Sequence, residues 1–240
     1  MNERKGYLIY LDLLGYKNII KGNSTQDIDE LRAFIDSFSE DYISKKARLM
    51  YGASYRPDKL FYKSYSDNFL IFYENEENEK SSLPIAIALA SSLLGAAIQA
   101  GFMLRGSIVF GELEFNDHAV FGKSIIEAYE LENNHIDPSV VLSSELQRIY
   151  TNEEYYKEDL LSPFSMYFRD DYDFAKTFVN GIGKIVKRLN YQSIVDERTL
   201  EKYRWLIKEF NRYYGGRCEL VFIEGPSHFD LEYSDTSANI

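Results

Sequence analysis

Apolar residues fill the stretch 7–16, YLIYLDLLGY, and Asp12 is the one charged side chain within it. The stretch is too short to span a membrane, and apolar residues at both alternating sets of positions are typical of a strand covered on both faces. An ionised carboxylate buried in such a strand is unfavourable unless it is paired, hydrogen-bonded or bound to a cation. The pattern therefore predicts a central strand in which Asp12 needs a positive partner, and a metal ion is one candidate.

Gly15 comes near the end of this stretch, where a glycine lets the backbone turn tightly into a following helix. The backbone N–H groups of Leu14, Gly15 and Tyr16 would then be free to face phosphate oxygens. We expect these three residues to form an anion-binding turn beside Asp12.

Hydrophobic periodicity and turn residues predict the remaining elements of residues 1–145. They are a long helix capped at 23–25 with Ile28, Leu31, Ile35, Phe38 and Tyr42 on one face, a loop at 51–59, a hairpin at 60–73 whose turn holds Asp67, a buried helix that begins near Pro84, a strand at 102–113, a short extended segment at 119–121, a helix at 122–133 and a short strand at 140–142. This order predicts an α+β fold with one main ferredoxin-like or palm-like sheet.

Residues 146–240 have a mostly helical pattern. Two amphipathic helices are predicted, one with Phe178, Ile182, Ile185, Val186 and Leu189 on one face and the other with Leu200, Tyr203, Ile207, Phe210 and Tyr214. We expect these helices to pack together and to be followed by a strand at 218–223 that can add to a sheet edge and a frayed tail at 234–240. The chain is thus divided into a core at 1–145 and a helical C-terminal extension at 146–240.

The composition limits the range of partners. The 38 acidic and 27 basic side chains give a formal net charge of −11, which argues against a broad surface for nucleic acid. The single cysteine, Cys218, excludes an internal disulfide and a multi-cysteine zinc site. The apolar run 83–104 is interrupted by serines, a glutamine and glycines, and residues 1–5 are not typical of a signal peptide. We expect a cytoplasmic protein that binds neither nucleic acid nor membranes.

Four short motifs follow one another over about 130 residues. They are Tyr10, Asp12, Leu13, Gly15 and Tyr16 in the first strand, Lys63 and Asp67 in the hairpin, Arg105, Ile108 and Gly111 in the second long strand, and Phe121-Gly122 before a helix that ends in Leu131-Glu132. In this order and spacing they resemble the catalytic domain of the class III nucleotidyl cyclases, the family of adenylate and guanylate cyclases. Ser66 stands where the family's hairpin motif usually has a glycine.

The resemblance implies an enzyme that converts a nucleoside triphosphate into a 3′,5′-cyclic nucleotide and pyrophosphate with two Mg²⁺ or Mn²⁺ ions. It implies that Asp12 and Asp67 bind these ions together with the backbone carbonyl of Leu13. Lys63 occupies the position that reads the base, where a lysine favours adenine and a glutamate favours guanine.

The resemblance also implies a head-to-tail homodimer. In this family each site takes its metal-binding aspartates from one subunit and its base-reading and transition-state residues from the other. Ile125, Ile126 and Tyr129 would provide apolar surface for such a dimer. The alternative is that they pack under the C-terminal helices.

Three family residues are replaced in this chain. Ile126 and Glu130 stand where the family has an asparagine that orients the ribose and an arginine that stabilises the transition state, and Ala119 stands where it has a base-selecting aspartate. Losing a group that stabilises developing charge typically lowers the rate about 10²–10³-fold. Lys123 and Arg105 are the candidate substitute cations. Prokaryotic relatives with altered pockets, including those resembling the pyrimidine cyclases of anti-phage signalling, make such substitution plausible.

Simpler interpretations of the same residues stay open. Asp12 could cap the helix after its strand without a metal, and Asp67 could be an ordinary turn residue. Lys63 and Arg105 could form salt bridges at a sheet edge. A chain without turnover would be a cyclase-like nucleotide-binding module that regulates a partner, and a metal-dependent nucleotidyl transferase on a palm-like sheet is a third alternative.

Overall fold

In the computed structural model, β1 (Arg4–Leu14) runs through the middle of a six-stranded sheet. The structure describes residues 3–22, 24–75, 79–115, 119–151, 162–164, 172–192, 195–216, 218–225 and 228–235. The other strands of this sheet are β2 (Leu60–Tyr65), β3 (Asn68–Glu74), β4 (Met103–Phe115), β5 (Val120–Phe121) and β6 (Val140–Leu142). The order is β2-β3-β1-β4-β5, with β6 parallel to β4, and every other pairing is antiparallel. The predicted α+β class is confirmed.

Both faces of β1 are buried, as its uninterrupted apolar pattern predicts. Tyr7, Ile9, Leu11 and Leu13 point into the larger core, which is built with α2 (Thr25–Ser37), α3 (Glu40–Tyr51), α4 (Glu79–Ala100) and α6 (Ser144–Thr151). Leu8 and Tyr10 point into a smaller cluster under α5 (Lys123–Asn133). Because side chains alternate along a strand, Asp12 lies on the α5 side of the sheet.

The segment predicted as one long helix is two helices. Residues 38–39 separate α2 from α3, and the Ser39 hydroxyl accepts a hydrogen bond from the Tyr42 N–H at 3.3 Å. Serine is a preferred helix N-cap because its hydroxyl satisfies a free backbone donor, so a second helix can begin there. Phe38 remains buried in the larger core, so the apolar face continues across the break.

The helix predicted to follow Gly15 is α1 (Tyr16–Gly22), and the segment predicted as a loop at 51–59 contains the short helical turns η1 (Gly52–Ser54) and η2 (Pro57–Lys59). In α4, the segment Leu83–Ala100 is long and apolar enough to cross a membrane by length and composition, and 67% of it is buried inside the structure. Leu89, Ala90 and Leu93 of this segment lie in the larger core, in agreement with the predicted buried helix.

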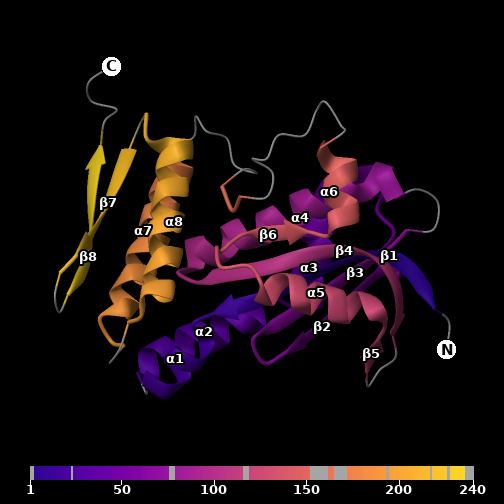
Figure 1. Ribbon diagram of the computed structural model, residues 1–240, viewed down its shortest axis with the longest axis horizontal. Coiled ribbons are helices and arrows are strands. Elements are labelled where there is room, and N and C mark those ends of the chain that lie inside the picture. The colour runs from indigo at the N-terminus through magenta and orange to yellow at the C-terminus, as the bar shows by residue number, and fades with distance from the viewer. Residues whose placement is uncertain are drawn as a thin grey trace.

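The C-terminal extension stands at the end of the sheet where β1 ends (Figure 1). Its elements are α7 (Tyr172–Leu189), α8 (Glu197–Tyr214), β7 (Cys218–Glu224) and β8 (Phe229–Asp235). The predicted packing of the two helices is confirmed, because their apolar faces share one buried cluster. β7 pairs with β8 as a separate two-stranded sheet instead of extending the main one, since Cys218 and Leu220 are buried against the helices. Of the tail predicted at 234–240, residues 234–235 belong to β8, and residues 236–240 lie outside the described residues.

Candidate functional site

Asp12 lies at the C-terminal end of β1, between two neighbouring strands. It pairs with Asn68 of β3 on one side and with Arg105 of β4 on the other. The N–H of Leu13 donates a hydrogen bond to the carbonyl oxygen of Asp67, 2.9 Å away in the β2–β3 turn. The fold thus brings together Asp12, Leu13 and Asp67, the three residues predicted to bind metal.

The turn that carries Asp67 has an unusual backbone. Ser66 has a φ of 57°, the left-handed region that glycine adopts most easily. This is the position at which the resembled motif has a glycine. The side chain of Asp67 accepts a hydrogen bond from the Asn68 amide at 3.2 Å, which holds its carboxylate at the sheet end.

Arg105 is a buried cation with several partners. Its Nε lies 2.5 Å from a carboxylate oxygen of Glu132 at the end of α5, and its NH1 group donates to the backbone carbonyl of His135 at 2.6 Å. The guanidinium is 4.0 Å from the carboxylate of Asp12. Arg105 therefore binds Glu132 tightly and Asp12 only loosely. The sequence offered Leu131-Glu132 only as the end of a motif, and no local signal identified Glu132 as the partner of Arg105.

Asp12 sits in an excess of negative charge. Burial, together with the carboxylates of Glu132 and Asp67, raises its pKa to about 6, and the opposing effects of Arg105 and Lys202 do not cancel that rise. Burial also raises the pKa of Glu132, although Arg105 opposes this. A divalent cation beside Asp12 and Asp67 would relieve the repulsion between these carboxylates.

The available donors fit a hard divalent ion that keeps water or phosphate ligands. Two carboxylates and the backbone carbonyl of Leu13 are oxygen donors, and Mg²⁺ is usually held by one or two carboxylates plus substrate phosphates. Within the described residues there is no group of three or more His, Cys, Asp or Glu side chains that could enclose a metal by themselves. The donor set therefore suits an ion that arrives with a phosphate-bearing ligand.

Tyr10 links the aspartate pair to α5. Its hydroxyl donates to the side-chain oxygen of Asn68, and its ring meets that of Tyr129 edge-on with centroids 6.3 Å apart. Burial and then the nearby charge of Asp12 raise the pKa of Tyr10, so it stays a neutral hydrogen-bond donor. It fixes Asn68, the β3 residue that directly follows Asp67.

The other predicted site residues lie at different distances from Asp12. Lys63 is on β2 opposite Leu70, one strand further from β1. Lys123 begins α5, nine residues before Glu132, which corresponds to about 14 Å along a helix. Within one chain the fold therefore does not bring Lys123 to Asp12.

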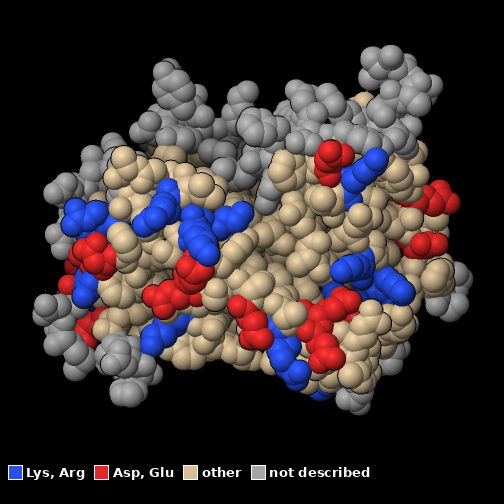
Figure 2. All heavy atoms as spheres, turned by 180° about the vertical axis from the view of Figure 1, so that it is seen from behind, with Lys and Arg blue, Asp and Glu red and all other residues tan. Residues whose placement is uncertain are grey.

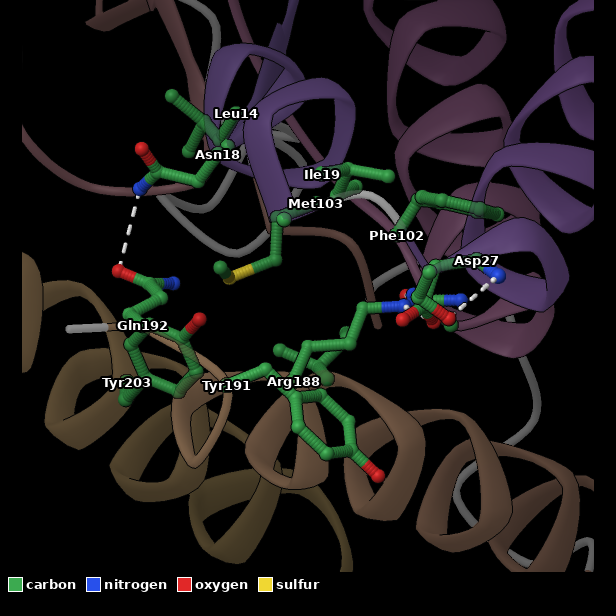
Figure 3. A pocket seen from close by; sticks show the side chains of 15 residues that line it. Leu14, Asn18, Ile19, Asp27, Phe102, Met103, Arg188, Tyr191, Gln192 and Tyr203 are labelled. Carbon is green, nitrogen blue, oxygen red and sulfur yellow. Dashed lines mark hydrogen bonds and ion pairs between the residues drawn. The ribbon is translucent and has the colours of Figure 1, made fainter.

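The predicted anion-binding turn has a helical start. Gly15 has a φ of 81°, and its carbonyl accepts hydrogen bonds from Asn18 at 2.9 Å and Ile19 at 3.1 Å as α1 begins. Leu14 and Gly15 also line a cavity of about 240 Å³ between α1 and α7. Figure 3 shows that Met103 points into this cavity and that an Asn18–Gln192 hydrogen bond of 3.1 Å connects the core with the extension.

The extension contributes a residue that sequence reasoning missed. Lys202 of α8 is close enough to Asp12 and Glu132 for its charge to lower the pKa of both carboxyls. No periodicity signal singles out this lysine, because its proximity to β1 depends on how the extension docks.

Figure 2 shows acidic and basic side chains interspersed over the rear face.

No family model and no curated protein matches the chain. Among solved structures it is similar in fold to guanylyl and adenylyl cyclase-like domains, the family whose motifs the sequence resembles. They include the guanylyl cyclase Cya2, with a TM-score of 0.47, 12% identity and coverage of 62% of this chain and 79% of that chain. The non-canonical dimeric guanylyl cyclase domain of the RhoGC fusion protein from Blastocladiella emersonii has a TM-score of 0.49 and 12% identity, with coverage of 63% of this chain and 86% of that chain. A class III adenylyl cyclase-like ATP-binding protein from Pseudomonas aeruginosa has a TM-score of 0.45 and 10% identity, with coverage of 84% of this chain and 43% of that chain. Similarity at this level carries no argument about activity, so the proposal below depends on the chain's own side chains.

Proposed function

We propose that this protein is a nucleotidyl cyclase that converts a nucleoside triphosphate into a 3′,5′-cyclic nucleotide and pyrophosphate. The observation that carries the proposal is the proximity of Asp12 to the turn that holds Asp67 at one sheet end, where burial and the charges of Glu132 and Asp67 raise the pKa of Asp12 to about 6. A divalent cation would stabilise these two carboxylates, and their oxygen atoms suit a cation that also binds a polyphosphate.

The reaction forms a bond from the ribose 3′ oxygen to the α-phosphorus and breaks the bond from that phosphorus to pyrophosphate. Bound Mg²⁺ or Mn²⁺, two ions in the proposed mechanism, would acidify the hydroxyl and neutralise the triphosphate. Asp12, Asp67 and the Leu13 carbonyl would hold the ions, and Leu14, Gly15 and Tyr16 would provide the turn beside the phosphates.

Three basic residues have separate roles in the proposal. Lys63 reads the base, with adenine favoured. Arg105 is already bound to Glu132 and His135, so we assign it the positioning of Asp12. Lys123, exposed at the start of α5, is the proposed transition-state cation, and it would act in the site of a second subunit.

The test is incubation of the purified chain with ATP, GTP, UTP or CTP and Mn²⁺, with detection of cyclic product and pyrophosphate. We expect one nucleotide to be cyclised and Asp12→Asn to abolish the activity. Asp29→Asn, which changes an exposed α2 aspartate, is the matched control and should keep it. Nucleotide binding without a cyclic product would instead identify a binding module, and a linear or oligonucleotide product would identify a transferase. A cyclic pyrimidine product would favour the predicted role in anti-phage signalling.

We further propose a head-to-tail homodimer. Phe121, Ile126 and Tyr129 are 55%, 61% and 53% exposed at β5 and α5, where a partner would cover them. Mixing Asp12→Asn chains with Lys63→Ala chains, each inactive alone, should restore part of the activity, because one intact shared site forms in each heterodimer. An active wild-type chain that stays monomeric with nucleotide and Mn²⁺ would overturn the dimer.

A further inference from the structure

The helix α8 is packed against the sheet end that carries Asp12. Tyr203 of α8 shares one buried cluster with Leu14 of β1 and Met103 of β4, and the same three residues line the cavity of Figure 3. The Arg188 side chain of α7 fixes the extension to the core through ion pairs with Asp27 and Glu30 of α2. These contacts set the position of α8 relative to the end of β1.

Lys202 is the α8 residue next to Tyr203, and it is half-buried. Its charge acts on Asp12 and Glu132, and the charges of Arg105 of β4 and of Arg198, one helical turn earlier on α8, act on it in turn. Among the described residues, no carboxylate lies within 4.0 Å of its ammonium group. The ammonium is therefore near the carboxylates but not paired with them.

A half-buried ammonium without an ion-pair partner is an unfavourable arrangement that a bound anion would relieve. Burial and then the charges of Arg105 and Arg198 lower the pKa of Lys202, although Asp196 and Asp12 oppose this. Asp12 forms no ion pair with the ammonium, and in the proposed function it binds the metal ion together with Asp67. A phosphate chain on a divalent ion at these aspartates would lie between Asp12 and Lys202, and lysine is a common point-charge ligand for phosphate.

We propose that α8 completes the nucleotide site from within the same chain, with Lys202, supported by Arg198, binding the polyphosphate of the metal-bound nucleotide. This assignment rests on the proposed function for the identity of the ligand. It gives the C-terminal extension a role in substrate binding and provides a cation on a chain in which Glu130 occupies a position expected for an arginine.

The opposite role for Lys202 would be to block the site by replacing the metal ion beside Asp12. The two roles predict opposite effects of removing Lys202 on the affinity for the triphosphate. A lysine that binds phosphate repels the metal and attracts the nucleotide, so its removal strengthens Mn²⁺ binding alone and weakens binding of the triphosphate. A lysine that blocks the site opposes both, so its removal strengthens both.

The experiment compares Lys202→Gln and Lys202→Arg with the wild-type full-length chain. Lys208→Gln, which removes an exposed lysine from the same helix, is the matched control. The quantities measured are the affinity for Mn²⁺ alone and, with Mn²⁺ present, the affinities for the nucleoside triphosphate, inorganic pyrophosphate and the nucleoside without phosphates. Circular dichroism and the melting temperature verify that each variant is folded.

We expect Lys202→Gln to weaken triphosphate and pyrophosphate binding about 10- to 100-fold, as loss of a charge-assisted hydrogen bond does, and to leave nucleoside binding unchanged. Mn²⁺ alone should bind at least as tightly, Lys202→Arg should retain most of the affinity, and Lys208→Gln should match the wild type. Unchanged triphosphate affinity in folded Lys202→Gln, or tighter binding of both metal and nucleotide, would overturn the inference. If the wild type makes no cyclic product but binds triphosphate in a Lys202-dependent way, the inference holds and the proposed activity fails.

Discussion

Two arginines in this chain, Arg105 buried and Arg188 half-buried, have similar partners at different distances. Arg188 of α7 contacts Asp27 at 3.0 Å and Glu30 at 2.7 Å, donates to the Gly101 carbonyl, and lies over the Phe102 ring. Arg105 of β4 likewise has two carboxylates and a backbone carbonyl, but one carboxylate, Asp12, is 4.0 Å away and Asp67 adds a further negative charge. In the first cluster both carboxylates contact the arginine, whereas in the second cluster Asp12 lies at the limit of the ion-pair distance, and burial together with the charges of Glu132 and Asp67 raises its pKa.

This difference separates a structural ion cluster from a binding site. Both clusters join distant parts of the chain, and in both the arginine is the residue that holds them together. Only at Arg105 does a buried carboxylate, Asp12, lie 4.0 Å from its arginine and near two further carboxylates, so that a divalent cation would be favourable there. The loose contact and raised pKa of one carboxylate, rather than the presence of a buried ion pair, therefore identify the candidate site.

The largest expected effect is that of removing the centre of the second cluster. Arg105→Met should reduce the free energy of unfolding by about 3–5 kcal/mol, because it leaves Glu132 buried without its partner. Urea denaturation measures this. The double variant Arg105→Met with Glu132→Leu should recover most of the loss, since the buried charge is then absent as well. A double variant as unstable as the single one would show that Arg105 acts through packing instead.

Arg188→Met should have a smaller effect, about 2–3 kcal/mol, because Glu30 remains 32% exposed and can be solvated after its partner is lost. The change should also loosen the extension from the core, so limited proteolysis should cut between α6 and α7 sooner than in the wild type. Lys187→Met, at an exposed neighbouring position, is the control. Equal effects at Arg188 and Lys187 would contradict the role of Arg188 as the link to α2.

Asp12→Asn tests the charge excess directly and should stabilise the metal-free fold by about 1–2 kcal/mol at pH 7.5. A pKa that rises from its ordinary value of 3.8 to about 6 means that folding favours the protonated carboxyl. Such a shift is worth at most about 3 kcal/mol, and Asp12 is 22% exposed.

The pH dependence fixes the sign of this prediction. The wild type should lose stability relative to Asp12→Asn as the pH rises from about 4 to about 6, and the gap should be constant above that range. Thermal melts across pH 4–8 without metal measure it. Added Mn²⁺ should stabilise the wild type and not the variant. A gap that widens toward low pH would contradict the charge-excess model.

The elements of the core were predictable because they depend on local signals. The alternation in β1, the turn at Ser66-Asp67-Asn68 and the helix after Gly122 all rest on residues within a few positions of one another. The position of the Asp67 turn beside the end of β1 also followed, because the predicted topology makes the strand and the hairpin neighbours. The break at Ser39 was missed because a serine cap within a continuing apolar face gives no change in periodicity.

The remaining parts of the site depend on contacts that no local pattern encodes. Glu132 meets Arg105 only after α5 has packed on the sheet, and Lys202 reaches Asp12 only because α8 docks on the end of β1. Arg188 and Asp27, which help to fix that docking, are 161 residues apart in the chain. Sequence periodicity therefore predicted the two helices of the extension but not where the extension docks on the core.

The smallest expected effect concerns the turn that places Asp67. Ser66 holds a φ of 57°, where a residue with a side chain is strained by about 1–2 kcal/mol, whereas glycine is not. Glycine also has a more flexible unfolded state, which offsets part of that gain, so Ser66→Gly should stabilise the fold by less than about 1 kcal/mol. Ser66→Val should instead destabilise the fold, by more than Ser66→Gly stabilises it, because a β-branched side chain is disfavoured at positive φ. If the turn only has to place Asp67, Mn²⁺ affinity should be unchanged in Ser66→Gly, and a lower affinity would mean that the serine hydroxyl itself contributes to the site.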